Sequence, residues 1–323
     1  MPDEIIAYLD LNYRNHKMKR DLLSINDITR YDLDRIIAFS AELKKYRGAM
    51  NYAPLAGKSI GMIFAKSSTR TRISFEVGIR ELGGNPLYLE QSKMQVGRGE
   101  SVADTAKVLS RYLHGIVIRT YKHEDVISLA EHGSVPVINA LTDAYHPCQV
   151  LTDLFTIYEF SQKLDGIKLV FVGDAQCNMA NSLILGAKLA GIELVISSPK
   201  EFRPADEIIN APFGTGSARW EPDPLKAVAG ADYIYTDVWV SMGCEAEAEY
   251  RLKIFRPYQV NSALLDAAPE AKIMHCLPAH RGEEITDAAV DSPQSIVFDQ
   301  AENRLHVQKA ILGLIFDEMN EQA

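Results

Sequence analysis

Short apolar runs alternate with longer amphipathic segments along most of the chain. Apolar runs bounded by turn residues predict buried strands, and apolar positions recurring every three or four residues predict helices. The predicted strands are 59–64, 116–119, 135–139, 168–172, 193–197, 232–235, 272–274 and 296–298. The predicted helices begin near residues 30, 70, 101, 125, 147 and 301, and the last of them ends near residue 319.

Polar residues at the ends of these segments support the assignment. Thr29 and Asp32 form a capping-box pattern before a helix whose apolar positions include Leu33 and Ile36. Ser101 and Asp104 repeat that spacing, and the pair Gly83-Gly84 is typical of a helix end.

Strands alternating with helices predict parallel sheets that are covered by helices on both faces. The chain is α/β, and we expect two doubly wound parallel-sheet domains with the active site in the cleft between them. The expected domains are residues 1–146 and 147–305, with the C-terminal helix 306–323 packing back on the first. A length of 323 residues suits two domains of roughly 150 residues each.

The charge balance limits which partners the chain can have. The formal net charge is −9, with 34 Lys and Arg against 43 Asp and Glu, which argues against a nucleic-acid partner. An anionic substrate would therefore need positive charge concentrated locally, because the overall field repels it.

The cysteines and the apolar runs indicate a reducing, aqueous compartment. None of the four cysteines stands in a CxxC pair or in zinc-ligand spacing, so neither a metal nor a disulfide framework is expected. No run of about 18 apolar residues occurs, so no membrane span is expected. The N-terminus is acidic and lacks an apolar signal region, and we expect a cytoplasmic location.

The segment 67–72, Ser-Ser-Thr-Arg-Thr-Arg, is the first candidate site. It follows a predicted strand and opens a predicted helix, where unpaired backbone N–H groups and a partial positive charge occur. Four hydroxyls and two guanidiniums join them, and all are donors that suit phosphate oxygens. The glycines of a P-loop are missing, and the alternative is an ordinary capped helix start.

Two further candidates lie at a domain junction and at a strand end. His146 stands before the proline that initiates a helix, and Gln149 lies one turn further on. A neutral imidazole at this place can donate one hydrogen bond to a carbonyl, although a capping histidine is the alternative. The turn at 173–178 follows a strand, where doubly wound sheets place ligand contacts, but it lacks GxGxxG and so does not indicate a dinucleotide.

The last two candidates follow the strands at 232–235 and 272–274. Asp237 at a strand end can hold an ammonium group, and the Ser241-Met242-Gly243 loop after it can close over a substrate. His275 and Cys276 suggest a catalytic pair, but adjacent strand residues point to opposite faces. His275 is therefore not expected to activate the thiol, and Cys276 is expected to contact substrate instead.

Together and in this order, these segments resemble the aspartate/ornithine carbamoyltransferase family over nearly the whole chain, from about residue 55 to 309. Ser68-Thr69-Arg70-Thr71-Arg72 and His146-Pro147-Cys148-Gln149 match the family's carbamoyl-phosphate motifs. Ser241-Met242-Gly243 and His275-Cys276-Leu277-Pro278 resemble its ornithine-binding form. The resemblance implies transfer of the carbamoyl group from carbamoyl phosphate to the δ-amine of L-ornithine, giving L-citrulline and phosphate.

Residue roles are carried over by position. The resemblance implies that carbamoyl phosphate is bound by Ser68, Thr69, Arg70, Thr71, Gln95, Arg119, His146, Gln149, Cys276, Leu277 and Arg304, with Gln95 reaching the phosphate of a neighbouring subunit. It implies that ornithine is bound by Asn178, Asp237, Ser241 and Met242. The residues expected to act in catalysis are Arg70, Arg119, His146, Asp237 and Cys276. Cys177 departs from the family, since many relatives have a second Asn there.

The same resemblance implies no cofactor, a homotrimer or an assembly of trimers with shared sites, and a role in arginine biosynthesis or more broadly in arginine metabolism. Only a neutral amine attacks, and with a reference pKa near 10.4 roughly a thousandth of ornithine's amine is neutral at pH 7. The residues leave open the proton acceptor, the direction of net flux and the size of the assembly. Alternatives are a putrescine carbamoyltransferase on the same scaffold and a non-catalytic relative that binds carbamoyl phosphate.

Overall fold

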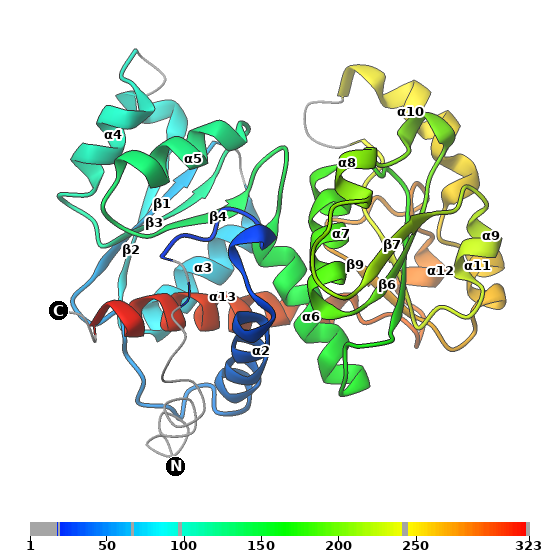
Figure 1. Cartoon of the computed structure of the whole chain (residues 1–323), viewed down its shortest axis with the longest axis horizontal. Helices are drawn as coiled ribbons and strands as arrows, with labels where there is room; N and C mark the ends of the chain where they lie inside the picture. The colour runs from blue at the N-terminus through cyan, green and yellow to red at the C-terminus, as the bar shows by residue number, and fades with distance from the viewer. Residues whose placement is uncertain (1–17, 19, 66–67, 96–98, 241–244, 321–323) are drawn as a thin grey trace. The chain divides into compact units, whose positions relative to one another are not determined.

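The computed structural model describes residues 18, 20–65, 68–95, 99–240 and 245–320. The chain divides into two compact units (Figure 1). Unit 1 comprises Met1–Phe155 with Asn303–Ala323, and unit 2 comprises Thr156–Glu302. Each is built on one parallel sheet, which confirms the predicted α/β class.

Unit 1 holds a four-stranded sheet in the order β2-β1-β3-β4. Its strands are β1 (Ser59–Phe64), β2 (Asn85–Glu90), β3 (Gly115–Arg119) and β4 (Val137–Leu141). Its helices are α2 (Arg30–Lys45), α3 (Thr69–Glu81), α4 (Val102–Leu109), α5 (His123–His132), the start of α6 (Pro147–Ser161) and most of α13 (Val297–Asn320). Figure 1 shows α4 and α5 over one face of this sheet, with α3 and α13 on the other.

Unit 2 holds a five-stranded sheet in the order β7-β6-β5-β8-β9. Its strands are β5 (Lys168–Val172), β6 (Glu193–Ser197), β7 (Ser217–Trp220), β8 (Tyr233–Thr236) and β9 (Lys272–His275). Its helices are α7 (Asn178–Ala190), α8 (Asp206–Ile209), α9 (Pro224–Val228), α10 (Ala248–Phe255), α11 (Ser262–Ala267) and α12 (Asp287–Val290). Because β5, β8 and β9 are adjacent and parallel, the turns that follow them meet at one edge of the sheet.

Capping residues define the helix starts that the sequence indicates. The Thr29 side chain accepts from the backbone N–H of Asp32, and the Asp32 carboxylate accepts from the N–H of Thr29 in return. A glycine pair ends a different helix, α3. Gly83 has φ +81°, and the N–H of Gly84 donates to Ile79 O at 2.8 Å, which closes the last turn. A Cβ on Gly83 would also lie 2.9 Å from the Cβ of Ala53.

The strand predicted at 296–298 is wrong, because Val297 begins α13. Its β-branched and aromatic residues favour a strand locally, but only Ser295 bridges to β9, and beyond it Val297 is buried while Phe298 is 66% exposed. The sequence also missed β2 and β7, each of which is one edge strand of its sheet. One contains Pro86, the other is only four residues long, and neither is a continuous apolar run.

Other boundaries differ by a few residues. The structure begins α4 at Val102, one residue after the predicted start, and places β4 at 137–141 rather than at 135–139. In the part of the chain that the structure describes, no helix is both long and apolar enough to cross a bilayer.

Candidate active site

In unit 1, three elements that are far apart in sequence converge on one hydroxyl. Thr71 lies in the first turn of α3 and is 1% exposed. Its Oγ1 accepts from Arg119 Nη1 at 3.2 Å and from Arg304 Nη2 at 2.7 Å. Arg119 ends β3 and Arg304 lies on α13, so two guanidiniums meet at this hydroxyl. Such an arrangement suits an anion.

His146 belongs to the same group of charges. It is buried just before Pro147 opens α6, and burial lowers the pKa of its imidazole well below the usual value. The positive charges of Arg304 and Arg119 lower that pKa further. The ring is therefore neutral at physiological pH, and a neutral imidazole donates from one nitrogen only.

The first turn of α3 presents the rest of the predicted phosphate group. Ser68 is the N-cap of α3, yet its side chain makes no capping hydrogen bond. Thr69 is exposed and Arg70 is half-buried in the same turn. These donors sit where backbone N–H groups of the helix are unpaired, so the turn offers an anion several donors at once. Ser67 lies outside the described residues.

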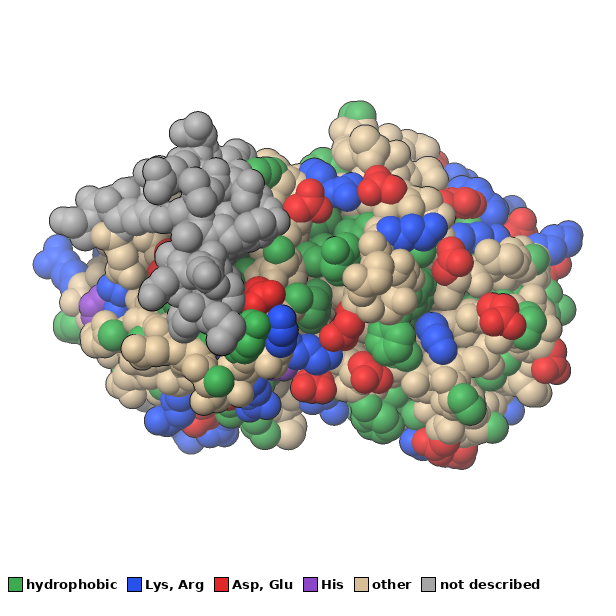
Figure 2. All heavy atoms as spheres, turned by 90° about the horizontal axis from the view of Figure 1, so that it is seen from below, with side chains coloured by type: hydrophobic (Ala, Val, Ile, Leu, Met, Phe, Trp, Pro, Cys, Tyr) green, Lys and Arg blue, Asp and Glu red, His purple; other side chains and the backbone are tan. Residues whose placement is uncertain are grey.

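Part of the positive charge of unit 1 is buried. Figure 2 shows Lys and Arg side chains interspersed with Asp and Glu on the face in view. Arg304, by contrast, is 4% exposed. Buried positive charge of this kind allows a chain with a net negative charge to bind an anionic ligand.

Gln95 and Cys148 stand apart from this group. Gln95 is exposed in the segment after β2, as a residue that reaches a neighbouring chain would be. Burial raises the pKa of the Cys148 thiol to about 12, and its Sγ donates to Asn139 O at 3.4 Å. Cys148 therefore packs the start of α6 and does not react.

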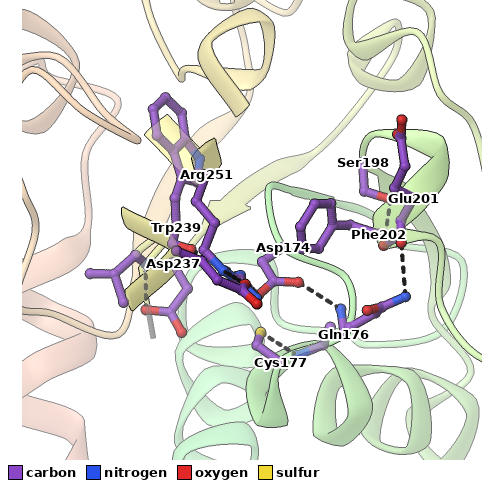
Figure 3. A network of polar contacts seen from close by, with 12 residues as sticks. Asp174, Gln176, Cys177, Ser198, Glu201, Phe202, Asp237, Trp239 and Arg251 are labelled. Atoms are coloured by element: carbon purple, nitrogen blue, oxygen red, sulfur yellow. Dashed lines mark hydrogen bonds and ion pairs between the residues drawn. The ribbon is translucent and has the colours of Figure 1, made fainter. Parts of the chain in front are cut away.

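In unit 2, the predicted residues gather at the edge where β5, β8 and β9 end. Asn178 is the first residue of α7, and Cys177 caps that helix by accepting from Ala180 N–H. Asp237 follows β8, and Figure 3 shows it near the turn that carries Asp174 and Cys177. Ser241 and Met242 lie outside the described residues.

Asp237 and Cys276 contact each other directly. The thiol donates to Asp237 Oδ1 at 3.0 Å, and the N–H of Val238 donates to the same oxygen at 2.8 Å. Burial raises the pKa of the Asp237 carboxyl, while His275 and the thiol act in the opposite direction. The thiol thus hydrogen-bonds to this carboxylate, while the two ring nitrogens of His275 contact Leu277 N–H and Glu284.

His275 has a different function, which the sequence did not reveal. Its Nδ1 accepts from Leu277 N–H at 2.9 Å, and its Nε2 contacts Glu284 Oε1 at 2.9 Å. Both side chains are fully buried. They hold the turn in which Leu277 adopts φ +56°, the turn that presents Cys276. Nothing in the spacing of residues 275 and 284 indicates this pairing before the fold is known.

The ligand atoms of Asp237, His275 and Cys276 lie within 4.8 Å of one another, a spacing that would admit a metal ion. Both ring nitrogens of His275 are already engaged, however, by Leu277 N–H and by Glu284. Only a thiol and a carboxylate remain in this cluster of described residues, which is fewer ligands than a stable zinc site uses.

A second feature missed by the sequence is the buried ion pair of Asp174 and Arg251 (Figure 3). Arg251 Nη1 donates to Asp174 Oδ2 at 2.8 Å and to Trp239 O at 3.2 Å. Its guanidinium also lies 4.9 Å from the centre of the Phe202 ring. The pair therefore fixes the chain after β8, shortly before residues 241–244. In the sequence, Arg251 is indistinguishable from a residue on a solvated helix face.

Comparison with known proteins covers both units. Residues 20–159 match the family model described as the carbamoyl-P binding domain of aspartate/ornithine carbamoyltransferase, and residues 165–315 match its Asp/Orn binding domain. The ornithine carbamoyltransferase of Syntrophus aciditrophicus is 52% identical over 305 residues, covering 92% of this chain and all of the relative. That of Methanoculleus marisnigri is 51% identical over 298 residues, covering 91% and 96%. The solved ornithine carbamoyltransferase of Pyrococcus furiosus superposes with a TM-score of 0.86 at 50% identity, covering 91% of this chain and 96% of the other.

Replacing Arg251 with Met should lower the free energy of unfolding by about 3–5 kcal/mol, because the Asp174 carboxylate is left buried without its cation. Burial already raises the pKa of Asp174, and losing Arg251 raises it further. The pKa of this carboxyl is then higher in the folded chain than in the unfolded chain. The folded state therefore loses stability as the pH rises from the unfolded-state pKa to the folded-state pKa. The deficit should therefore be full near pH 8 and shrink as the pH falls toward about 4.

Urea unfolding measured at several pH values tests this expectation. Lys253→Met is the matched control, since Lys253 is exposed on the same helix and its loss should cost little. A deficit for Arg251→Met that does not change with pH would show that the pair is not the cause.

Proposed function

The chain belongs to the aspartate/ornithine carbamoyltransferase family, and from that premise we infer that it transfers the carbamoyl group of carbamoyl phosphate to the δ-amine of L-ornithine. The products are L-citrulline and phosphate. Relatives about 50% identical over nearly their whole length carry the name ornithine carbamoyltransferase, which disfavours the putrescine alternative.

For the donor, the observation that carries the proposal is the convergence of Arg119 and Arg304 on Thr71 beside neutral His146. We assign the phosphate to Ser68, Thr69, Arg70 and Thr71, and the carbamoyl group to Arg119, His146 and Gln149. Arg304 completes the set from α13. The guanidiniums neutralise the phosphate, and the imidazole donates to the carbamoyl oxygen without adding a full charge.

For the acceptor, the proposal rests on Asp237 beside Cys276 and on Asn178 at the start of α7. A buried carboxylate is the natural partner of an amine or ammonium group. Ser241 and Met242 are assigned to ornithine by their position in the family motif. Cys276 and Leu277, in the turn after β9, are assigned to carbamoyl phosphate by the same resemblance.

The neutral δ-amine attacks the carbamoyl carbon and forms the C–N bond, and the C–O bond to phosphate then breaks. The nitrogen loses one proton in the process, which the departing phosphate dianion can accept. The carbamoyl oxygen gains negative charge in the tetrahedral intermediate, where Arg70, Arg119 and His146 act as preorganised donors. Removing one such donor typically costs about 3 kcal/mol of transition-state stabilisation, or about 100-fold in rate.

We also propose that the chain acts as a homotrimer or an assembly of trimers, with Gln95 reaching a neighbouring subunit's site. Edge strand β2 exposes Leu87 and Tyr88, each 38% exposed, and the neighbouring helix α3 exposes Ile73, 54% exposed. Apolar residues at an uncovered sheet edge favour a protein partner, and Gln95 follows that strand. Three described cysteines are free, which favours the cytoplasm as the location.

The acceptor can be tested by measuring carbamoylation of ornithine, putrescine and aspartate in competition. Ornithine should be used with a kcat/KM at least about 100-fold above the others, because a site built to bind polar groups rejects analogues that lack them. Comparable use of putrescine would overturn the acceptor assignment and leave the donor assignment intact.

Arg70→Gly should lower kcat about 100-fold or more while the protein stays folded, since one transition-state donor is lost. Arg80→Gly on the same helix is the matched control for the glycine itself, because Arg80 is exposed and contacts only Glu76 at 3.7 Å among its ion pairs within the described chain. Near-normal turnover in Arg70→Gly would contradict the proposed site.

Light scattering should give a mass that is three times 35.9 kDa, or a multiple of that trimer mass. Tyr88→Glu should weaken the assembly because it places a charge on the apolar edge, whereas Tyr250→Glu, on the exposed face of α10 in unit 2, should not. An active monomer would refute the shared site.

A further inference from the structure

Gln149 is a fully buried amide with only one end satisfied. It lies in the first turn of α6 and is 1% exposed. Its Nε2 donates to Asp153 Oδ1 at 2.8 Å, one turn further along the helix. Its Oε1 has no hydrogen-bond partner among the residues that the structure describes. A buried acceptor without a donor is unusual, and it indicates a place where a ligand donates.

Asp153 decides which end of the amide is left open. An ionised carboxylate only accepts hydrogen bonds, so it contacts the NH₂ end of Gln149 and turns the carbonyl oxygen away. Asp153 is itself fully buried on the same helix, at i+4 from Gln149, so the pair is held in one rigid element. Without this carboxylate, the two orientations of the amide would differ little in energy.

Gln149 Oε1 is a hydrogen-bond acceptor, whereas the guanidiniums and the imidazole of the site in unit 1 are donors. Arg70, Arg119 and Arg304 are donors only, and neutral His146 donates to a carbonyl. The backbone N–H of Gln149 donates to the backbone O of His146 at 3.2 Å, so the two residues share the turn that opens α6. A carbamoyl group carries one acceptor oxygen and an NH₂ with two donors. The donors of the site meet the oxygen and the phosphate, and within unit 1 Gln149 Oε1 is an acceptor open to the NH₂.

We propose that Asp153 is a positioning residue that makes the site selective for the NH₂ of its donor substrate, by fixing Gln149 with its carbonyl oxygen toward the carbamoyl group. This rests on the proposed function, because it takes carbamoyl phosphate as the ligand of unit 1. Asp153 touches no substrate and acts through Gln149. The selectivity it provides is against acyl phosphates of the same size and charge that carry a methyl group in place of NH₂, such as acetyl phosphate.

Exchanging the amide and the carboxylate between positions 149 and 153 tests the orientation of the Gln149 amide directly. In Asp153→Asn, residue 153 can either donate or accept, so the amide of Gln149 is no longer fixed. In Gln149→Glu, two carboxylates face each other where 2.8 Å now separates a donor and an acceptor. In the double variant, the amide introduced at position 153 donates to one oxygen of the carboxylate introduced at position 149. The other oxygen of that carboxylate is left as the acceptor, and the net charge is unchanged from the wild type.

The readouts are the KM for carbamoyl phosphate and the inhibition constants of acetyl phosphate and inorganic phosphate. Asp153→Asn should raise the KM for carbamoyl phosphate about tenfold, reduce the preference over acetyl phosphate by a similar factor, and leave inhibition by inorganic phosphate within about twofold. Gln149→Glu should be impaired further, and the double variant should recover to within about threefold of the wild-type KM. Thr152→Val, which removes the hydroxyl contact to Cys148 O on the same helix, measures the general cost of changing a buried polar residue there.

A purely structural role for Asp153 predicts a different pattern. Carbamoyl phosphate, acetyl phosphate and inorganic phosphate would then all bind more weakly to Asp153→Asn, and the double variant would recover nothing. Either result overturns the proposal. If Asp153→Asn does not fold, Gln149→Met decides: it should lose the preference over acetyl phosphate and keep inhibition by inorganic phosphate, and an unchanged preference overturns the proposal.

The proposed function and the proposed role of Asp153 can be refuted separately. A wild-type protein that forms no citrulline from ornithine and carbamoyl phosphate refutes the proposed function itself. A wild-type protein that forms citrulline, with no selective effect in the exchanged variants, refutes only the role of Asp153.

Discussion

The repulsion between Arg119 and Arg304 is the interaction on which the donor half of the site depends. Both guanidiniums bind Oγ1 of Thr71 in a buried place, where like charges repel far more than in water. The fold holds them there because β3, α3 and α13 are fixed by the packing of unit 1. An anion bound beside both guanidiniums would offset this repulsion and so stabilise the folded chain. Burial, reinforced by these two positive charges, lowers the pKa of His146 well below its usual value, so its neutral ring donates from one nitrogen only.

In unit 2, the buried charged groups of the site are carboxylates rather than guanidiniums. Asp237 and Asp174 are carboxylates at the ends of β8 and β5, and burial raises the pKa of both. Asp174 is neutralised by Arg251, which also fixes the backbone of Trp239. Within the described chain, Asp237 accepts hydrogen bonds from Val238 N–H and the Cys276 thiol and makes no ion pair with a Lys or Arg. One carboxylate is thus paired within the fold, and the other is the one that we propose as the partner of the substrate amine.

Local sequence pattern predicted the elements of the fold better than the partners within the site. Buried central strands such as β5 and β6 read as apolar runs, whereas edge strands β2 and β7 are half-exposed and do not. The donors at 68–71 and Asp237 could be named because they sit at element ends, where the chain exposes polar groups. Arg304 was named only by resemblance, since it meets Thr71 across 233 positions of sequence. Arg251, Glu284 and Asp153 were missed because their partners become neighbours only in the folded chain, or because a polar residue in an apolar helix gives no sign of which way it faces.

The chemistry of the donor substrate explains why charge alone is insufficient. Carbamoyl phosphate and the product phosphate are both anions, so the guanidiniums and the turn at the start of α3 attract both. The electrostatic attraction in a buried site depends on the charge of the whole anion. It therefore distinguishes poorly between ligands of equal charge. Discrimination must therefore come from the neutral end of the molecule, where hydrogen bonds have direction. Among groups that only donate, an acceptor such as Gln149 Oε1 is the one kind of atom that can recognise an NH₂, and a carboxylate behind it is the simplest way to keep that acceptor facing forward.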